Sequence, residues 1–174
     1  MIETNRLNLK PLNYGQLLKY LRCDNSLEKE LNLEETSRTV SPALKEAFEQ
    51  TILPNVADPN KNYLFSTLWT AISKSHNKMV GDLCIVGEPN ADGEIEIGYG
   101  TYEAFRGQGF MTEIVAGIVE WCKGQANVKA LLASTGKTNP ASFRVLEKNH
   151  FKNIGETDVL FHWRLQLDGP EAGQ

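Results

Sequence analysis

A glycine-containing segment just before an apolar run with helical spacing is the part of this sequence best suited to bind an anion. The segment is Arg106-Gly107-Gln108-Gly109-Phe110-Met111-Thr112. The N-terminus of a helix presents free backbone N–H groups and the positive end of the helix dipole, which together attract phosphate. Because glycine has no Cβ, the backbone can approach such a group closely. The sequence therefore predicts either a phosphate site here or a turn that only reverses the chain.

The residues on either side of this segment have the periodicity of a strand and of a helix. Apolar and polar residues alternate over 94–102, which predicts a strand with Glu94 and Glu96 on its polar face. From Met111 to Cys122 the apolar residues recur at i, i+3, i+4 and i+7, as on one face of a helix. The possible phosphate site is thus a strand–turn–helix connection.

The rest of the chain predicts further strands with helices between them. Strands are expected over 4–12, 63–72, 79–86, 128–134, 151–155 and 159–167, and helices around 17–21, from 42 and from 140. Ser41-Pro42 resembles a helix N-cap, and Pro54 is expected to end that helix. The acidic stretch 26–35 is expected to be a solvated helix face; attraction of a cationic acceptor is the alternative.

Together these elements predict one α+β domain over residues 1–167. Its centre is expected to be a twisted mixed sheet of about six or seven strands with about four helices around it. The tail, residues 168–174, contains Gly-Pro and Glu-Ala-Gly and is expected to be frayed.

Composition excludes several classes of protein. The 174 residues are 41% hydrophobic and 23% charged with a net charge of −4, as in an ordinary soluble globular domain. No apolar stretch approaches the ~18 residues of a membrane span, and the first residues lack the apolar core of a signal peptide. Mild acidity argues against non-specific nucleic-acid binding. The three scattered cysteines and three scattered histidines predict reduced thiols and no metal site, so we expect a cytoplasmic protein.

One segment is basic although the chain is acidic. Residues 101–152 carry seven basic and four acidic side chains, whereas the segments before and after it have net charges of −4 and −3. This segment contains the glycine turn. A phosphate-bearing ligand would account for the bias, and random variation in composition is the alternative.

Three motifs in and next to this segment resemble the GNAT superfamily of acyl-CoA-dependent N-acetyltransferases. They are Glu-Ile-Gly-Tyr at 96–99, Arg-Gly-Gln-Gly-Phe-Met-Thr-Glu at 106–113 and Asn-Pro-Ala-Ser-Phe-Arg-Val-Leu-Glu-Lys at 139–148. Their order, spacing and strand–turn–helix context agree with the family. The opening, Thr-Asn-Arg-Leu-Asn-Leu-Lys-Pro-Leu at 4–12, resembles the first strand of the Rim-type branch, which acetylates ribosomal-protein N-termini and other amines.

The resemblance implies how acetyl-CoA would bind. Residues 106–112 would wrap the pyrophosphate, with Met111 in place of the last small residue of the family signature. The strand at 97–99 would pair with the pantetheine arm like an added strand, and Asn139 would contact that arm. The expected cofactor-binding residues are Ile97, Gly98, Tyr99, Arg106, Gly107, Gln108, Gly109, Phe110, Met111, Thr112 and Asn139.

The implied reaction also needs a proton acceptor, because an amine arrives protonated. Glu96, on the strand beside the expected acyl group, is the first candidate, Glu94 is the second, and water is a third. Solvation or pairing with a lysine is the alternative for both glutamates. Ser142 matches the serine near the thioester sulfur and would donate a hydrogen bond to it; the alternative is an ordinary residue of the first helical turn.

Three positions depart from the family pattern. Gly100 replaces a tryptophan, which predicts a reshaped acceptor pocket. His150 replaces a glycine, which predicts a changed helix cap. Leu146 stands where many members carry a tyrosine general acid, so one standard acid is missing.

The reading that follows is an enzyme that transfers acetyl from acetyl-CoA to a primary amine by direct attack in a ternary complex. Backbone N–H groups near Gly98 and Tyr99 would stabilise the oxyanion. The alternatives are a non-catalytic acyl-CoA-binding module, favoured by Leu146, and a protein-interaction domain. The acceptor could be a protein N-terminus or a small molecule, and the protein could be a monomer or a homodimer.

Overall fold

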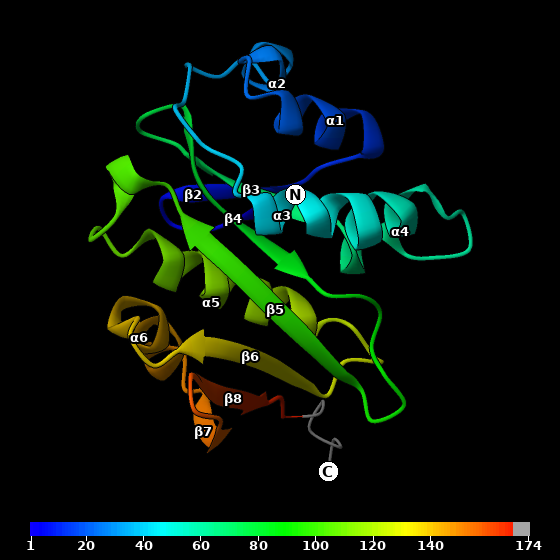
Figure 1. Ribbon diagram of the computed structural model, residues 1–174, viewed down its shortest axis with the longest axis vertical. Coiled ribbons are helices and arrows are strands. Elements are labelled where there is room, and N and C mark those ends of the chain that lie inside the picture. Colours follow the sequence, from blue (N-terminus) through cyan, green and yellow to red (C-terminus); the bar gives the residue numbers. More distant parts are fainter. Residues whose placement is uncertain (169–174) are drawn as a thin grey trace.

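A single mixed sheet of eight strands forms the centre of the computed structural model, which describes residues 1–168 (Figure 1). The strands are β1 (Ile2–Glu3), β2 (Leu7–Pro11), β3 (Leu68–Ser73), β4 (Lys78–Ile85), β5 (Glu94–Thr101), β6 (Ala130–Gly136), β7 (Lys152–Glu156) and β8 (Leu160–Gln166). Their order is β1-β2-β3-β4-β5-β6-β8-β7, and only β5 and β6 are parallel. The predicted α+β class is confirmed. The predicted tail lies outside the described residues except for Asp168.

Helices cover both faces of the sheet. They are α1 (Tyr14–Arg22), α2 (Ser26–Glu30), α3 (Pro42–Ala47), α4 (Leu53–Ala57), α5 (Phe110–Lys123) and α6 (Pro140–Lys148). One apolar cluster packs α5 and α6 against the sheet, and a second packs α1 to α4 against the opposite face. Within residues 1–168 no helix is long and apolar enough to cross a membrane.

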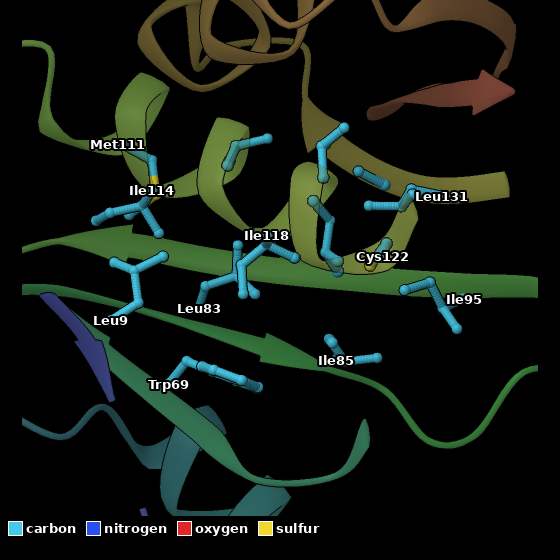
Figure 2. Close-up of a cluster of buried hydrophobic side chains, with 14 of the residues drawn as sticks. Leu9, Trp69, Leu83, Ile85, Ile95, Met111, Ile114, Ile118, Cys122 and Leu131 are labelled. Carbon is cyan, nitrogen blue, oxygen red and sulfur yellow. The ribbon is translucent and has the colours of Figure 1, made fainter. Parts of the chain in front are cut away.

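Helix α5 is held in place by the larger apolar cluster. Its predicted apolar stripe packs against β2, β4 and β5 (Figure 2). Met111 and Ile114 lie at the N-terminal end of this contact, and Cys122 lies near the other end. Because this stripe is buried, the first turn of α5 is fixed relative to β5, where the expected binding residues lie.

The parallel pair β5–β6 opens into a V. Their register runs from Glu94 opposite Ala130 only as far as Glu96 opposite Leu132. Beyond this point the strands separate toward their C-terminal ends, as Figure 1 shows. The edge of β5 that faces β6 is therefore free of strand pairing over 97–101, although its other edge stays paired with β4.

Two local predictions are wrong. Pro54 does not end the helix that begins after Ser41: a wider π-helical turn, Phe48–Ile52, follows α3, and Pro54 lies at the start of α4. The wider π-helical bond from Leu53 N to the Phe48 carbonyl comes just before Pro54, and the helix continues past the proline although it has no N–H to donate. The acidic stretch 26–35 is not uniformly solvated either, because Glu28 is fully buried and forms an ion pair with Arg38.

The end of α6 explains one departure from the family pattern. His150 follows α6 with φ +66°, in the left-handed region where glycine is favoured. We expect His150→Gly to raise the free energy of unfolding by about 0.5–1 kcal/mol, because glycine adopts this conformation without strain. His150→Ala removes the same imidazole but keeps the Cβ, so it should give no such gain. Melting temperatures of the two variants measure this, and an equal gain in both would contradict it.

Candidate active site

The glycine turn and the first turns of α5 and α6 surround a pocket of about 570 Å³ on the open side of β5. We call it the α5–α6 pocket. Nine of the residues singled out in the sequence lie in its wall: Tyr99, Arg106, Gly107, Gly109, Phe110, Met111, Thr112, Asn139 and Ser142. The structure thus brings together residues from three separate motifs.

The N-terminus of α5 has the geometry of an anion site. Gly107 and Gly109 have φ values of +75° and +78°, so both require the left-handed region that glycine adopts freely. Gly109 is the N-cap of α5, and among the described residues no side chain caps this end. The first N–H groups of the helix are therefore left for a ligand. A phosphate group fits this cradle.

A contact with the N-terminal segment holds the turn in place. Glu113, in the first turn of α5, accepts hydrogen bonds from Thr4 Oγ1 at 2.7 Å and from Arg6 N and Nε at 2.6 and 2.7 Å. The Arg6 guanidinium also donates to the backbone carbonyl of Gln108 at 2.9 Å and lies over the ring of Phe110. These contacts hold the pKa of the Glu113 carboxyl below its usual range against the opposing effect of its partial burial. Glu113 is thus occupied and does not oppose an anion in the turn.

Two cations in the pocket wall were not singled out from the sequence. Arg144 and Lys148 lie one helical turn apart on α6 and line the pocket with Arg106. All three side chains are exposed and can reach phosphate groups. The basic bias of residues 101–152 and their place in the motif at 139–148 were the signals, although nothing in their local spacing marks them as ligand contacts.

A tyrosine–serine pair joins β5 to α6. Asn139 caps α6 by accepting from Ser142 N at 3.2 Å. Ser142 Oγ donates to the Tyr99 hydroxyl at 3.2 Å, and that hydroxyl donates to the Ser142 carbonyl at 3.0 Å. Burial raises the pKa of the Tyr99 hydroxyl. Tyr99 therefore stays protonated and able to donate at neutral pH, while Leu146 is fully buried in the core.

A second pocket, of about 730 Å³, lies on the other face of the sheet, between β4–β5 and the segment 37–44. We call it the β4–β5 pocket. Tyr99, Gly100, Thr101 and Arg106 line both pockets, so the two cavities meet at the C-terminal end of β5. A Cβ built at Gly100 meets no atom of the described chain within 4 Å. The residue that replaces the family tryptophan thus leaves open space.

A buried carboxylate lies in the wall of the β4–β5 pocket. Asp82 is directly opposite Gly100 in the register of β4 with β5 and is 7% exposed. Its Oδ2 accepts from the Tyr20 hydroxyl at 2.6 Å and from the Tyr102 hydroxyl at 2.7 Å. Its Oδ1 is buried and has no hydrogen-bond partner among residues 1–168. Burial raises the pKa of this carboxyl, although the hydroxyls of Tyr102, Tyr20 and Thr70 and the charge of Arg38 oppose the effect.

The other singled-out residues lie outside the pocket walls or in only one of them. Gly98 lines the β4–β5 pocket alone. Ile97 points into the core, and Glu96 is exposed on the face of β5 that also carries Gly98; neither is among the described wall residues. Gln108 contributes its carbonyl to Arg6. Glu94, the second candidate base, is bound to Arg164 at 2.7 Å, which lowers the pKa of its carboxyl.

The chain matches known acetyltransferases over most of its length. A family model for the acetyltransferase (GNAT) domain matches residues 6–152. YjdG of Bacillus subtilis, an uncharacterized N-acetyltransferase, is 26% identical over 166 residues, which cover 94% of this chain and 96% of YjdG.

Solved structures share the whole fold at low sequence identity. The ribosomal-protein-S5-alanine acetyltransferase of Vibrio fischeri superposes with a TM-score of 0.68 at 16% identity, covering 94% of each chain. RimL, a ribosomal L7/L12 alpha-N-protein acetyltransferase solved with coenzyme A, superposes with a TM-score of 0.67 at 16% identity, covering 96% of this chain and 97% of RimL. The expected likeness to Rim-type enzymes is confirmed at the level of the fold. With the family model matching residues 6–152, the chain belongs to the GNAT acetyltransferase family.

Proposed function

We propose that this protein transfers an acetyl group from acetyl-CoA to a primary amine by direct attack in a ternary complex. The observation that carries the proposal is the meeting of two pockets at residues 99–101 of β5. One pocket is suited to phosphate groups and the other contains a buried carboxylate. Two substrates held in these pockets would meet at the same short stretch of backbone.

Acetyl-CoA would occupy the α5–α6 pocket. The N–H groups at the start of α5 would bind the pyrophosphate, with Arg106, Arg144 and Lys148 as neighbouring cations. The unpaired edge of β5 would accept the pantetheine arm in the position of an added strand. In that position the thioester would lie beside Gly98 and Tyr99, whose backbone N–H groups would stabilise the oxyanion.

The departing thiol would leave next to Tyr99 and Ser142. A thiol ionises far more readily than an alcohol, so the thiolate is a tolerable leaving group and needs only a hydrogen-bond donor. The hydroxyls of Tyr99 and Ser142 lie 3.2 Å apart, and either would supply that donor by exchanging the hydrogen bond that it donates within the pair. We propose that this pair takes the place of the tyrosine that is missing at Leu146.

The amine would enter the β4–β5 pocket. The names of RimL and the S5-alanine acetyltransferase specify protein N-termini as acceptors for those enzymes. For this chain we propose a primary amine on either a protein N-terminus or a small molecule. The sequence suggests Glu96 as the proton acceptor, but its side chain is exposed and is not among the described residues of either pocket wall.

Acetyl-CoA binding and turnover test the proposal. Acetyl-CoA at a hundred times its dissociation constant should stabilise the fold by about 2.7 kcal/mol, which raises the melting temperature by roughly 5–10 °C. A panel of small amines and peptide N-termini, followed by release of the free thiol of CoA, should then identify an acceptor.

The two measurements separate the alternatives. A thermal shift without turnover on any amine or peptide would favour the non-catalytic acyl-CoA-binding module. The absence of any shift at millimolar acetyl-CoA would contradict both readings and leave a protein-interaction domain.

A further inference from the structure

The β4–β5 pocket contains a buried carboxylate, Asp82, that forms no hydrogen bond with a cation among residues 1–168; the second carboxylate of the wall, Glu103, is exposed. Among the charged groups near it, Arg38 is bound to the buried Glu28 and donates a further bond to the backbone carbonyl of Tyr20. Asp82 is approached instead by neutral hydroxyls: Tyr20 and Tyr102 donate to Oδ2, and Thr70 lies beside the carboxyl, opposite Asp82 in the register of β3 with β4. Burying a carboxylate without a cation is costly, and a perturbed acid in the wall of a pocket is a candidate for a functional group.

We propose that Asp82 binds the ammonium group of the acceptor through Oδ1 and takes its proton, which makes Asp82 a catalytic residue. This proposal rests on the proposed acetyl transfer. Asp82 lines the pocket, its Oδ1 has no partner in the described chain, and it lies opposite Gly100, where both pockets meet. Tyr20 and Tyr102 fix the carboxylate by donating to Oδ2 and are positioning residues.

The direction of the proton transfer follows from burial. Removing a carboxylate and an ammonium group from water disfavours the charged form of both, so the pKa of the acid rises and that of the amine falls. In bulk water the ammonium holds the proton; in a desolvated pair the carboxylate gains it more readily. The position of Asp82 inside the pocket therefore favours transfer from nitrogen to Oδ1.

The complete step balances without any further reactant. The ammonium N–H bond breaks, an O–H bond forms at Oδ1, and the freed lone pair forms the C–N bond with the acyl carbon. The C–S bond then breaks, and a second proton from nitrogen goes to the departing thiolate, giving the amide and the thiol of CoA. Asp82 returns to the carboxylate by losing its proton to solvent.

The residues of the pocket wall determine which charges an ammonium group would meet there. Neutral residues Ser37, Thr39, Ser41, Leu44 and Leu68 form much of the wall. The titratable or charged groups that face Asp82 are Tyr20 from α1, Tyr102 after β5, Arg38 from the segment before α3 and Cys84 on β4. Arg106 and Glu103 also lie in the wall, but both are exposed and their charges are opposite. With Arg38 bound to Glu28, the buried Asp82 has no hydrogen-bonded cation of its own among residues 1–168.

Asp82→Asn tests the catalytic role. It removes the charge while keeping an oxygen that accepts from a tyrosine, and we expect kcat/KM for the acceptor amine to fall by about 10²–10³ at neutral pH. The loss should shrink as the pH rises, because more amine is already deprotonated. Asp92→Asn, in the exposed turn before β5, is the matched control and should behave as wild type. Asp82→Asn with wild-type kcat/KM, or with a smaller loss than Glu96→Gln, would overturn the proposal.

Tyr102→Phe separates positioning from general damage. Its hydroxyl bonds to the charged form of Asp82 and so opposes the rise in the pKa of that carboxyl. Asp82 accepts a proton only when ionised, so activity falls as the pH drops through its pKa. Losing the hydroxyl should therefore move the acidic limb of the pH–kcat/KM profile to higher pH. A merely structural defect lowers activity at every pH, and an unmoved limb would contradict the positioning role.

Binding of butylamine distinguishes failure of this proposal from failure of acetyl transfer. In the presence of CoA, butylamine should perturb the NMR signals of Asp82 and Gly100, whereas butan-1-ol of the same length should not. Asp82→Asn should weaken butylamine binding at least tenfold and leave the acetyl-CoA dissociation constant unchanged. If no amine is ever acetylated but this difference holds, the ammonium site stands and the proposed reaction is wrong. Equal butylamine binding by wild type and variant would overturn the site.

Discussion

Gly109→Val should bind acetyl-CoA at least tenfold more weakly than wild type, a difference of about 1.4 kcal/mol. The N-cap of α5 has φ +78°, a conformation that costs a β-branched residue roughly 1–2 kcal/mol. A branched side chain at this point would also lie where the turn must come within hydrogen-bond distance of a phosphate, ~2.9 Å from N to O. The variant should therefore lose both fold stability and affinity. Isothermal titration and melting temperatures with and without acetyl-CoA measure the two effects.

A second glycine separates these two effects. Gly87 has φ +91°, a Cβ there meets nothing within 4 Å in the described chain, and it lies in neither pocket wall. Gly87→Val should thus lose comparable stability yet keep the full thermal shift with acetyl-CoA. If Gly109→Val also kept its full thermal shift with acetyl-CoA, Gly109 would be needed only for the conformation of the turn and not for binding phosphate.

Gly81→Val should lower the free energy of unfolding by about 2 kcal/mol or more, which is roughly 4–8 °C in melting temperature. A Cβ at Gly81 would lie 2.9 Å from the carbonyl oxygen of Gly100 and 3.3 Å from the Cα of Thr101. Both atoms belong to the backbone of β5, so no side-chain rotation relieves the clash. The two strands must separate at the point where the pockets meet. Urea unfolding curves give the size of the loss.

Gly155→Val is the matched control for this substitution. Gly155 also lies in a strand, β7, but a Cβ there meets nothing within 4 Å among residues 1–168. Valine is favoured in strands over glycine, so this variant should be neutral or slightly stabilised. Equal destabilisation of both variants would show that glycine in a strand, and not the clash with β5, determines the cost.

Local patterns were enough to predict the cofactor side of the site. The turn at 106–109 and the stripe on α5 are set by neighbours in sequence: glycines supply the positive φ values, and the 3.6-residue period supplies the buried face. The basic residues of α6 were visible as a bias in charge and as part of the motif at 139–148. Their place in the same pocket depends on the docking of α6, which no local pattern encodes.

The acceptor side could not be predicted in the same way. Asp82 is 62 residues from Tyr20 and 20 from Tyr102. The pairing of β4 with β5 brings Tyr102 to it, and the packing of α1 into the smaller apolar cluster brings Tyr20. One signal was present, because Asp82 is the only charged residue between Met79 and Ile85 in a strand that is otherwise apolar or glycine. The buried Glu28 was missed for the same reason, since its partner Arg38 is supplied by a loop without periodicity.

The helix that continues past Pro54 shows a second reason why a prediction from the sequence fails. A proline breaks a helix when its neighbours demand regular α-helical bonds. Here the backbone hydrogen bonds just before Pro54 follow the wider π-helical pattern of Phe48–Ile52. Phe48 and Ile52 in this turn are buried in the smaller apolar cluster. Tertiary packing thus overrides a local rule.

The contact of Arg6 with Glu113 and Gln108 joins the N-terminal segment to the glycine turn before α5. It spans more than a hundred residues, so it forms only after the N-terminal strand has joined the sheet. Whenever β2 detaches in the native ensemble, the turn loses this support even while α5 stays folded. Hydrogen exchange of the amides at 107–109 should then follow the opening of β2 and not the slower opening of α5, which makes the N-terminal strand the element that sets the lifetime of the ordered turn.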